Sequence, residues 1–392
     1  MEINVTAKAP GPSEDYISAD KAFVLRQPTA YAKPKVVENT AVATLTPLLL
    51  IVLAIVVMLL IMYRLRWYIY RRLPRIPHFM IEEQECLGEG IHAEVNKAQI
   101  HRKNLFGQPT QETVAIKRLK EGATEREEGR LLEEALLLSK LSHRNIIKAK
   151  GICMDIRPLM FVMEYMNGGS VHSFLQQTEA RQSTEQRELM KMATGIAEAC
   201  VYLEKQQIVH KDICARNCLV HLSAMQPPAI ASVKLADFGL ARIAESPQQN
   251  TAEGEANNPL PVPWTAPETF RNVASSQSDV WSFGVFLWET FSFCATPFGK
   301  CSLRNHRCPM KEYQHTEIER MVTDGRISLI DLNPPCTVVF SPNLLGVLSR
   351  CFEWNPEHRP SFAELKCMVA ELGNGSDDKH CQDESEVVLI DM

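Results

Sequence analysis

The segment from His210 to Asn217, with the sequence HKDICARN, holds three side chains whose types and spacing could carry out chemistry. Asp212 is a carboxylate that could accept the proton of a substrate hydroxyl, and Arg216 follows as a nearby cation. Asn217 offers an amide oxygen, a hard ligand of the kind that Mg²⁺ binds. A proton acceptor, a cation and a metal ligand at these offsets are what the transfer of a phosphoryl group to a hydroxyl requires.

Six further motifs occur in order around this segment. They are LGEGIHAEV (Leu87 to Val95), VAIK (Val114 to Lys117), DFG (Asp237 to Gly239), LPVPWTAPE (Leu260 to Glu268), DVWSFG (Asp279 to Gly284) and HRPSF (His358 to Phe362). One short match could arise by chance in a chain of 392 residues. An ordered set spanning about 280 residues favours a shared function over chance.

Together these motifs resemble those of receptor-type protein tyrosine kinases, over about three quarters of the chain. Serine/threonine kinases usually carry Lys two residues after the catalytic Asp, whereas this chain has Cys214 there and places its cation at Arg216. The LPVPW sequence before Glu268 also resembles tyrosine kinases. The resemblance implies an α+β, bilobal protein-kinase fold, with a small β-rich N-lobe containing one helix and a larger helical C-lobe.

The resemblance also implies roles for individual residues. Asp212, Arg216, Lys117 and Glu134 are the expected catalytic residues, with Glu133 as the alternative partner of Lys117. ATP is the expected nucleotide, and Mg²⁺ is expected to bind to Asn217 and Asp237. The residues expected to contact ATP are Leu87, Gly88, Glu89, Gly90, Val95, Ala115, Lys117 and, through their backbone, Glu164 and Met166. Met163 falls at the gatekeeper position.

Several residues depart from the family pattern. The third glycine of the glycine-rich loop is Ala93, and His92 replaces the usual aromatic residue, which predicts a lower affinity for ATP. Lys211 replaces Arg before the catalytic Asp and lacks the bidentate guanidinium fork. The segment from Asp237 to Glu268 contains no tyrosine, so activity is predicted not to depend on tyrosine phosphorylation there.

A long apolar stretch precedes the kinase-like region. No charged residue occurs from Asn39 to Tyr63, and about 20 apolar residues are enough to cross a bilayer. The arginines after this stretch are Arg64, Arg66, Arg71, Arg72 and Arg75, against Lys33 and Lys35 before it. This asymmetry predicts a single-pass protein of the plasma membrane with its N-terminus outside and its kinase domain in the cytosol. All 12 cysteines follow the stretch, as expected of reduced thiols.

These patterns predict the following organisation. Residues 1–40 form a short extracellular stalk, 41–63 one transmembrane helix, 64–78 a basic juxtamembrane segment, 79–372 the kinase domain (N-lobe 79–166, C-lobe 167–372) and 373–392 an acidic, disordered tail. Runs such as TVAIKRL and LMFVMEYM predict strands, whereas EREEGRLLEEALLLSKL and TEQRELMKMATGIAEACVYLEKQ predict helices.

The expected partners are protein substrates with tyrosine, membrane lipid and a second copy of the chain in a homodimer. The net charge of −5 and the pI near 6.2 give no reason to expect a nucleic-acid partner. The residues favour a transmembrane protein tyrosine kinase that transfers the γ-phosphoryl group of ATP. They leave two alternatives open, a pseudokinase scaffold that binds nucleotide weakly and a membrane-tethered serine/threonine or dual-specificity kinase.

Overall fold

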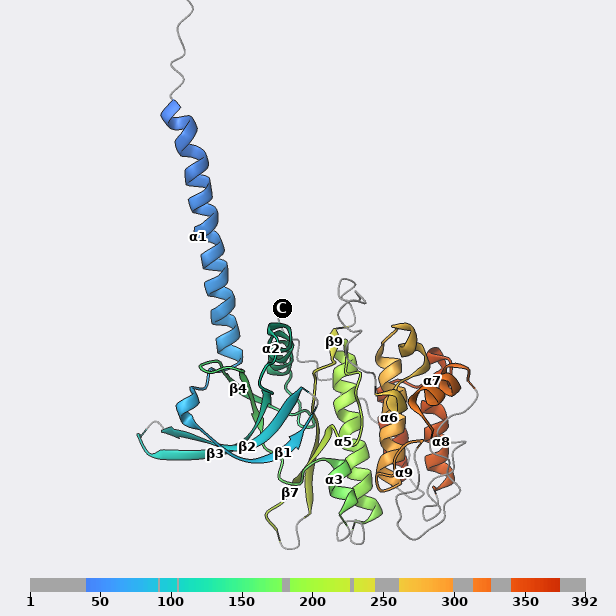
Figure 1. The fold of residues 1–392 in the computed structure, drawn as a ribbon. Helices are drawn as coiled ribbons and strands as arrows, with labels where there is room; N and C mark the ends of the chain where they lie inside the picture. Colours follow the sequence, from blue (N-terminus) through green and yellow to red (C-terminus); the bar gives the residue numbers. More distant parts are fainter. Residues whose placement is uncertain are drawn as a thin grey trace, which may run out of the picture. The chain divides into compact units, whose positions relative to one another are not determined.

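The computed structural model describes residues 40–90, 92–103, 106–177, 184–225, 229–243, 261–298, 313–325 and 340–373. The chain divides into two units, Met1–Met62 and Tyr63–Met392. Most of the predicted stalk and all of the predicted tail beyond Gly373 lie outside the described residues. The fold that positions the site belongs entirely to the second unit (Figure 1).

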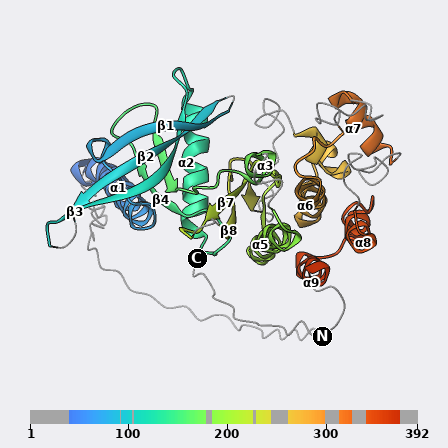
Figure 2. The ribbon, with the colours of Figure 1, turned by 90° about the horizontal axis from the view of Figure 1, so that it is seen from below.

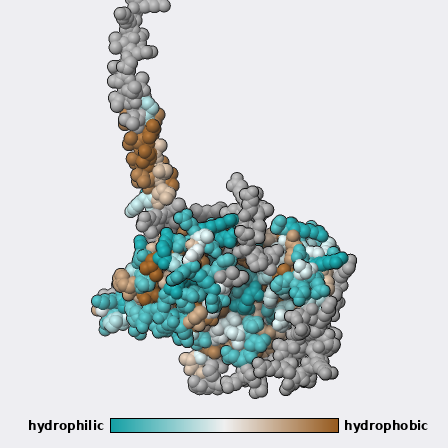
Figure 3. Space-filling view, viewed as in Figure 1, coloured by the Kyte–Doolittle hydropathy of each residue, from teal (hydrophilic) through white to brown (hydrophobic). Residues whose placement is uncertain are grey.

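Helix α1 (Thr40–Arg72) contains the apolar stretch and ends shortly before Pro74, whose ring cannot continue a helix. Its large apolar side chains from Leu49 to Tyr63 are exposed, and Figure 3 colours the described part of this helix mainly as hydrophobic. Among the described residues, no helix meets the length and hydropathy needed to cross a membrane.

A five-stranded antiparallel sheet forms the N-lobe. Its strands are β1 (Ile81–Glu89), β2 (Ala93–Lys103), β3 (Pro109–Leu119), β4 (Ala149–Cys153) and β5 (Met160–Glu164), in the order β1-β2-β3-β5-β4. The predicted strands TVAIKRL and LMFVMEYM correspond to β3 and β5. Because side chains alternate along a strand, Val114 and Ile116 enter one apolar cluster, while Ala115 and Lys117 point to the opposite face.

Helix α2 (Glu125–Lys140) is the single long helix described in the N-lobe, and the sequence predicted it. Thr124 and Glu127 form a capping box that satisfies backbone N–H groups at its start. Its buried residues are Leu131, Glu134, Ala135 and Leu138, which share one face at helical spacing. In Figure 2 the helix lies beside the sheet.

The residues directly after α1 also belong to the N-lobe. Leu73 is fully buried and Ile76 is 2% exposed. Ile76 N donates to Ile152 O and Ile152 N donates to Pro74 O, each at 2.9 Å, so this segment lies along β4 as an added edge. A short 3₁₀ turn, η1 (His78–Met80), leads into β1. The packed N-lobe therefore begins before residue 79, within the predicted juxtamembrane segment.

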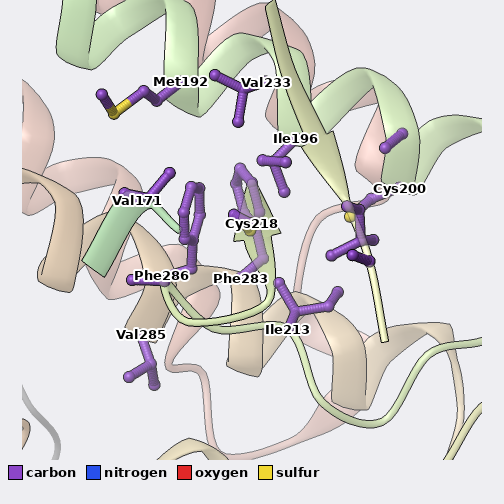
Figure 4. Close-up of a cluster of buried hydrophobic side chains, with 14 of the residues drawn as sticks. Val171, Met192, Ile196, Cys200, Ile213, Cys218, Val233, Phe283, Val285 and Phe286 are labelled. Atoms are coloured by element: carbon purple, nitrogen blue, oxygen red, sulfur yellow. The ribbon is translucent and has the colours of Figure 1, made fainter. Parts of the chain in front are cut away.

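The C-lobe is mainly helical. Its described helices are α3 (Val171–Gln176), α5 (Gln186–Lys205), α6 (Ser276–Phe291), α7 (His315–Thr323), α8 (Pro342–Cys351) and α9 (Phe362–Gly373), with 3₁₀ turns at η3 (Val262–Trp264), η4 (Pro267–Arg271) and η5 (Pro356–His358). Helix α5 packs against α9 and α6. Figure 4 shows Phe283 and Phe286 of α6 meeting Ile196 of α5 and Cys218 in the core between them.

Two short antiparallel ribbons hold the loops of the C-lobe. They pair β6 (Ile208–Val209) with β9 (Arg242–Ile243) and β7 (Cys218–Leu222) with β8 (Ile230–Leu235). Arg359 braces this lobe, because its guanidinium donates to both carboxylate oxygens of Glu268 at 2.6 and 3.0 Å. A sheet-based N-lobe and a helical C-lobe confirm the predicted bilobal fold.

Candidate active site

The loop from His210 to Asn217 runs between β6 and β7, and helix α6 fixes its first half. His210 N and Lys211 N donate to the two carboxylate oxygens of Asp279 at 2.7 and 2.9 Å. Lys211 has a φ of 69°, an unfavourable backbone conformation for a residue with a long side chain. Burial raises the pKa of Asp279 to about 7, against the opposing effect of the two N–H groups. The loop is therefore held in a strained conformation by a buried carboxyl group.

Asp212 is oriented by the two other functional residues of its own loop. Arg216 Nη2 donates to Asp212 Oδ1 at 2.6 Å, and Asn217 Nδ2 donates to Asp212 Oδ2 at 2.8 Å. The Asp212 side chain is 14% exposed, so it remains open to a ligand on one side. These bonds hold the carboxylate in one orientation, as a proton acceptor needs.

The β7–β8 hairpin brings Asn217 and Asp237 together from distant parts of the sequence. Asn217 precedes β7 and Asp237 follows β8, and Ala236 N donates to Asn217 O at 2.9 Å across the end of the hairpin. Because the Asn217 amide nitrogen donates to Asp212, its oxygen is left to bind a cation. No three His, Cys, Asp or Glu side chains of the described chain gather as a metal site. Asn217 and Asp237 offer oxygen atoms of the kind that a divalent cation binds.

Lys117 joins the two lobes through two carboxylates. Its Nζ lies 2.8 Å from Glu134 Oε2 and 2.8 Å from Asp237 Oδ1. Glu134 is the partner, rather than Glu133, because it lies on the buried face of α2, whereas the adjacent residue is turned to the exposed face. The alternation along β3 directs Lys117 away from the outer cluster that contains Ile116.

The charges in this cluster shift the pKa values of its members. Burial alone would lower the pKa of Lys117, but Glu134 and Asp237 outweigh burial and raise it. The Lys117 ammonium holds the pKa of Asp237 below its usual value. Burial raises the pKa of Glu134, and Lys117 opposes that effect. Lys117 is thus charged at physiological pH.

Strand pairing places the predicted nucleotide-contacting residues on neighbouring strands. Gly88 is opposite Val95, Val95 is opposite Lys117, and Ala115 is opposite Met163. Leu87 is 44% exposed, and a Cβ at Gly88 would meet nothing within 4 Å, so this edge is open. The arrangement suits the backbone approach of a phosphate-bearing ligand.

The end of β5 and the residues after it include Glu164 and Met166, the two residues predicted to contact ATP through their backbone. The Glu164 carboxylate accepts bonds from Lys234 Nζ at 2.8 and 2.9 Å and from Lys148 N at 2.6 Å. Among the hydrogen bonds of the described residues, the backbone N–H of Met166 donates to no acceptor, and the residue is only 7% exposed. A buried N–H normally has an acceptor, so a ligand edge is a fitting partner for it.

The departures in the glycine-rich loop have local structural explanations. Ala93 begins β2 opposite Leu119 and does not have a positive φ, so a methyl group is accommodated without strain. His92 Nδ1 lies 2.9 Å from Glu127 Oε1 in the capping box of α2. Gly90 N donates to Ala93 O at 2.7 Å. Glu89, one of the predicted nucleotide contacts, has its carboxylate 2.6 Å from Lys120 Nζ.

Three residues without a role predicted from sequence support the loop from His210 to Asn217, called the catalytic loop below. Asp279 bonds to its first half, Glu289 accepts from Ala215 N at 2.8 Å, and Trp264 Nε1 donates to Glu289 at 3.0 Å. Asp279 lay within a recognised motif but was given no role, and Trp264 was treated only as part of a substrate motif. Glu289 was missed entirely, although a charged residue near the end of an apolar helical run is a detectable signal. Within the tyrosine-free segment from Asp237 to Glu268, residues 244–260 lie outside the described residues.

Comparison with known proteins identifies the class of protein that this fold and site define. Residues 81–369 match the family described as protein tyrosine and serine/threonine kinase, and the chain belongs to that family. The predicted resemblance to protein tyrosine kinases is confirmed.

Two of the following three relatives are tyrosine kinases by name. The chain is 32% identical over 303 residues to the human proto-oncogene tyrosine-protein kinase ROS, covering 75% of this chain and 12% of that protein. It is 33% identical over 299 residues to protein sevenless of Drosophila melanogaster, covering 74% and 11%. It is 32% identical over 309 residues to the tyrosine-protein kinase transforming protein ros of UR2 avian sarcoma virus, covering 76% and 70%. The chain therefore spans about an eighth or less of the ROS and sevenless proteins.

Proposed function

We propose that this chain is an active protein tyrosine kinase that transfers the γ-phosphoryl group of ATP to tyrosine hydroxyls of proteins. The observation that carries the proposal is two groups of side chains in direct contact. Lys117 bonds to Glu134 and Asp237, and Asn217 bonds to the Asp212 carboxylate, at 2.8 to 3.0 Å. A pseudokinase would have no need to keep every one of these groups oriented.

In the proposed reaction the tyrosine hydroxyl oxygen forms a bond to the γ-phosphorus of ATP, and Asp212 accepts the proton of that hydroxyl. The bond from that phosphorus to the β–γ bridging oxygen breaks, and ADP leaves. Lys117 binds the α- and β-phosphates and Glu134 orients Lys117, while Arg216 stabilises charge on the transferred group. Asn217 and Asp237 would hold Mg²⁺, which neutralises phosphate charge when bound.

One contact favours tyrosine over serine or threonine as the acceptor. The Arg216 guanidinium lies 4.4 Å from the centroid of the Trp264 ring, on the segment before Glu268. An apolar ring beside the catalytic cation offers a surface for the longer phenol side chain. A serine or dual-specificity kinase remains the second candidate, supported only by the breadth of the matched family.

We further propose that the first unit anchors the kinase in the plasma membrane, with the N-terminus outside and lipid as a partner. Two observations support this proposal. The stretch from Asn39 to Tyr63 contains no charged residue, and its large apolar side chains from Leu49 onward are exposed. Protease added to intact cells should leave the kinase domain whole. Its digestion there would contradict this orientation.

The test of the activity uses the full chain, labelled ATP, Mg²⁺ and peptides with Tyr, Ser or Thr, followed by phosphoamino-acid analysis. Phosphotyrosine is expected, and its loss in Asp212→Asn would exclude a contaminating kinase. Glu319→Ala, an exposed change on α7, is the matched control. Label on serine or threonine alone would select the second candidate, and nucleotide binding without transfer would select the pseudokinase.

A further inference from the structure

The carboxyl group of Glu289 lies behind the catalytic loop, in helix α6. The residue is 2% exposed, and its Oε2 accepts two hydrogen bonds. One comes from Ala215 N at 2.8 Å, and the other comes from Trp264 Nε1 at 3.0 Å. A single buried oxygen thus joins the catalytic loop to the segment before Glu268.

These two bonds continue into the active site. The Trp264 ring lies against the Arg216 guanidinium at 4.4 Å, and Arg216 Nη2 donates to Asp212 Oδ1 at 2.6 Å. Ala215 precedes Arg216 in sequence, so the bond from Ala215 N to Glu289 restrains the backbone next to Arg216. The bond from Trp264 to Glu289 restrains the ring against which the Arg216 side chain lies. A cation is stabilised by an aromatic ring only while the ring keeps its place.

Helix α6 therefore supports the loop at two points. Asp279 accepts from His210 N and Lys211 N, and Glu289 accepts from Ala215 N. Ten residues separate the two carboxyl groups, about 15 Å along a helix, which is enough to support both halves of the loop. Asp279 fixes the strained first half, and Glu289 fixes the half that carries the cation.

We propose that Glu289 is a positioning residue that orients Arg216, and through it Asp212, by holding Trp264 and the backbone of Ala215. The proposal rests on the kinase activity proposed above. Its action is through the geometry of other groups, because Glu289 is only 2% exposed and its carboxyl group accepts from Ala215 N and Trp264 Nε1. A misplaced catalytic group lowers turnover far more than it lowers nucleotide binding.

Three variants of the full chain test the proposal. Glu289→Ala removes the shared acceptor and should lower kcat about 10- to 100-fold with little change in the KM for ATP. Glu289→Gln keeps a carbonyl oxygen that accepts both bonds and should restore most of that loss. Trp264→Phe keeps the ring but removes its N–H, and should give a smaller fall in kcat. Glu319→Ala is the control and should match the parent.

A double-mutant cycle adds a measurement that general destabilisation would not produce. If Glu289 acts partly through Trp264, the double variant with Trp264→Phe and Glu289→Ala should lose less than the product of the single losses. Multiplicative losses, or a kcat for folded Glu289→Ala within about twofold of the parent, would overturn the proposal. Should Glu289→Ala fail to fold, an unchanged kcat in Trp264→Phe would overturn the proposed route through the ring.

Amide hydrogen exchange separates this proposal from the proposed activity. Amide hydrogen exchange at Ala215 N should accelerate at least about tenfold in Glu289→Ala. If that variant does not fold, Glu289→Leu takes its place. The control Glu319→Ala should not change the exchange rate. Acceleration in a chain without kinase activity would support the anchoring role while the proposed function fails. Unchanged exchange would refute the role whatever the activity.

Discussion

The most consequential prediction concerns where the folded kinase begins. A chain starting at Phe79, the predicted domain boundary, lacks Leu73 and Ile76, which are 0% and 2% exposed. Burying each such side chain contributes about 1.5 to 3 kcal/mol. The two backbone bonds with Ile152 contribute about 1 kcal/mol each, so the total loss is about 5 to 8 kcal/mol. This is comparable with the whole stability of an ordinary domain, about 5 to 15 kcal/mol.

A chain starting at residue 64 should therefore unfold cooperatively in urea, whereas one starting at residue 79 should be largely unfolded or aggregated. Point variants of the longer chain refine the test. Leu73→Ala should cost about 2 to 5 kcal/mol. Phe79→Ala is the matched control, because that side chain is 82% exposed, and it should change stability by less than about 0.5 kcal/mol. Equal stability of the two chains, or of the two variants, would refute the reasoning.

Gly151 provides independent evidence that the segment after α1 packs against β4. A Cβ at this position would meet the Pro74 carbonyl oxygen and lie 2.6 Å from Ile76 Cδ1. The backbone of β4 thus approaches the segment after α1 closely enough to exclude any side chain. The salt bridge between Arg75 and Asp155 adds little, because both side chains are partly exposed.

Three other predictions concern the active site. Asp237→Asn should abolish transfer while the fold survives, and transfer above about a tenth of the parent rate would contradict its role as a metal ligand. Ala93→Gly should leave the KM for ATP within about twofold of the parent, because no positive φ is needed there, and a clear fall would show that the methyl group obstructs nucleotide. Burial raises the pKa of Glu289 from 4.5 to about 7, so the folded state binds its proton more tightly than the unfolded state does. The stability that this group contributes is present at low pH and is lost as pH rises from 4.5 to 7. In urea unfolding, the free energy of unfolding of Glu289→Gln should therefore rise by about 3 kcal/mol relative to that of the parent over this range. A difference that stays constant with pH would contradict this prediction.

The glycine-rich loop shows how a departure from a family pattern gains a different meaning in three dimensions. From sequence, His92 and Ala93 indicated a damaged phosphate loop. In the fold, His92 contacts Glu127 at the start of α2, and Ala93 continues β2. The sequence showed the loss of an aromatic residue and a glycine. The new contact depends on the distance between two segments that sequence does not reveal.

The sequence by itself determined the family, the bilobal fold and the residues that form the candidate site. It could do so because phosphoryl transfer fixes residue types at fixed offsets, as in the segment from Asp212 to Asn217, and because local periodicity specifies α2 and β3. Lys117 was recognised from its strand context, but its partner was decided by the rotation of α2, which buries Glu134 and exposes its neighbour.

Only the tertiary structure decided the supports of the site and the start of the domain. Asp279 and Glu289 act on loop atoms more than 60 residues away in sequence. From sequence, Leu73 and Ile76 were assigned to the basic juxtamembrane segment, whereas the fold buries both against the N-lobe. The physical reason is common to both cases: long-range hydrogen bonds and burial depend on which segments meet after folding, and neither residue type nor periodicity encodes that meeting locally.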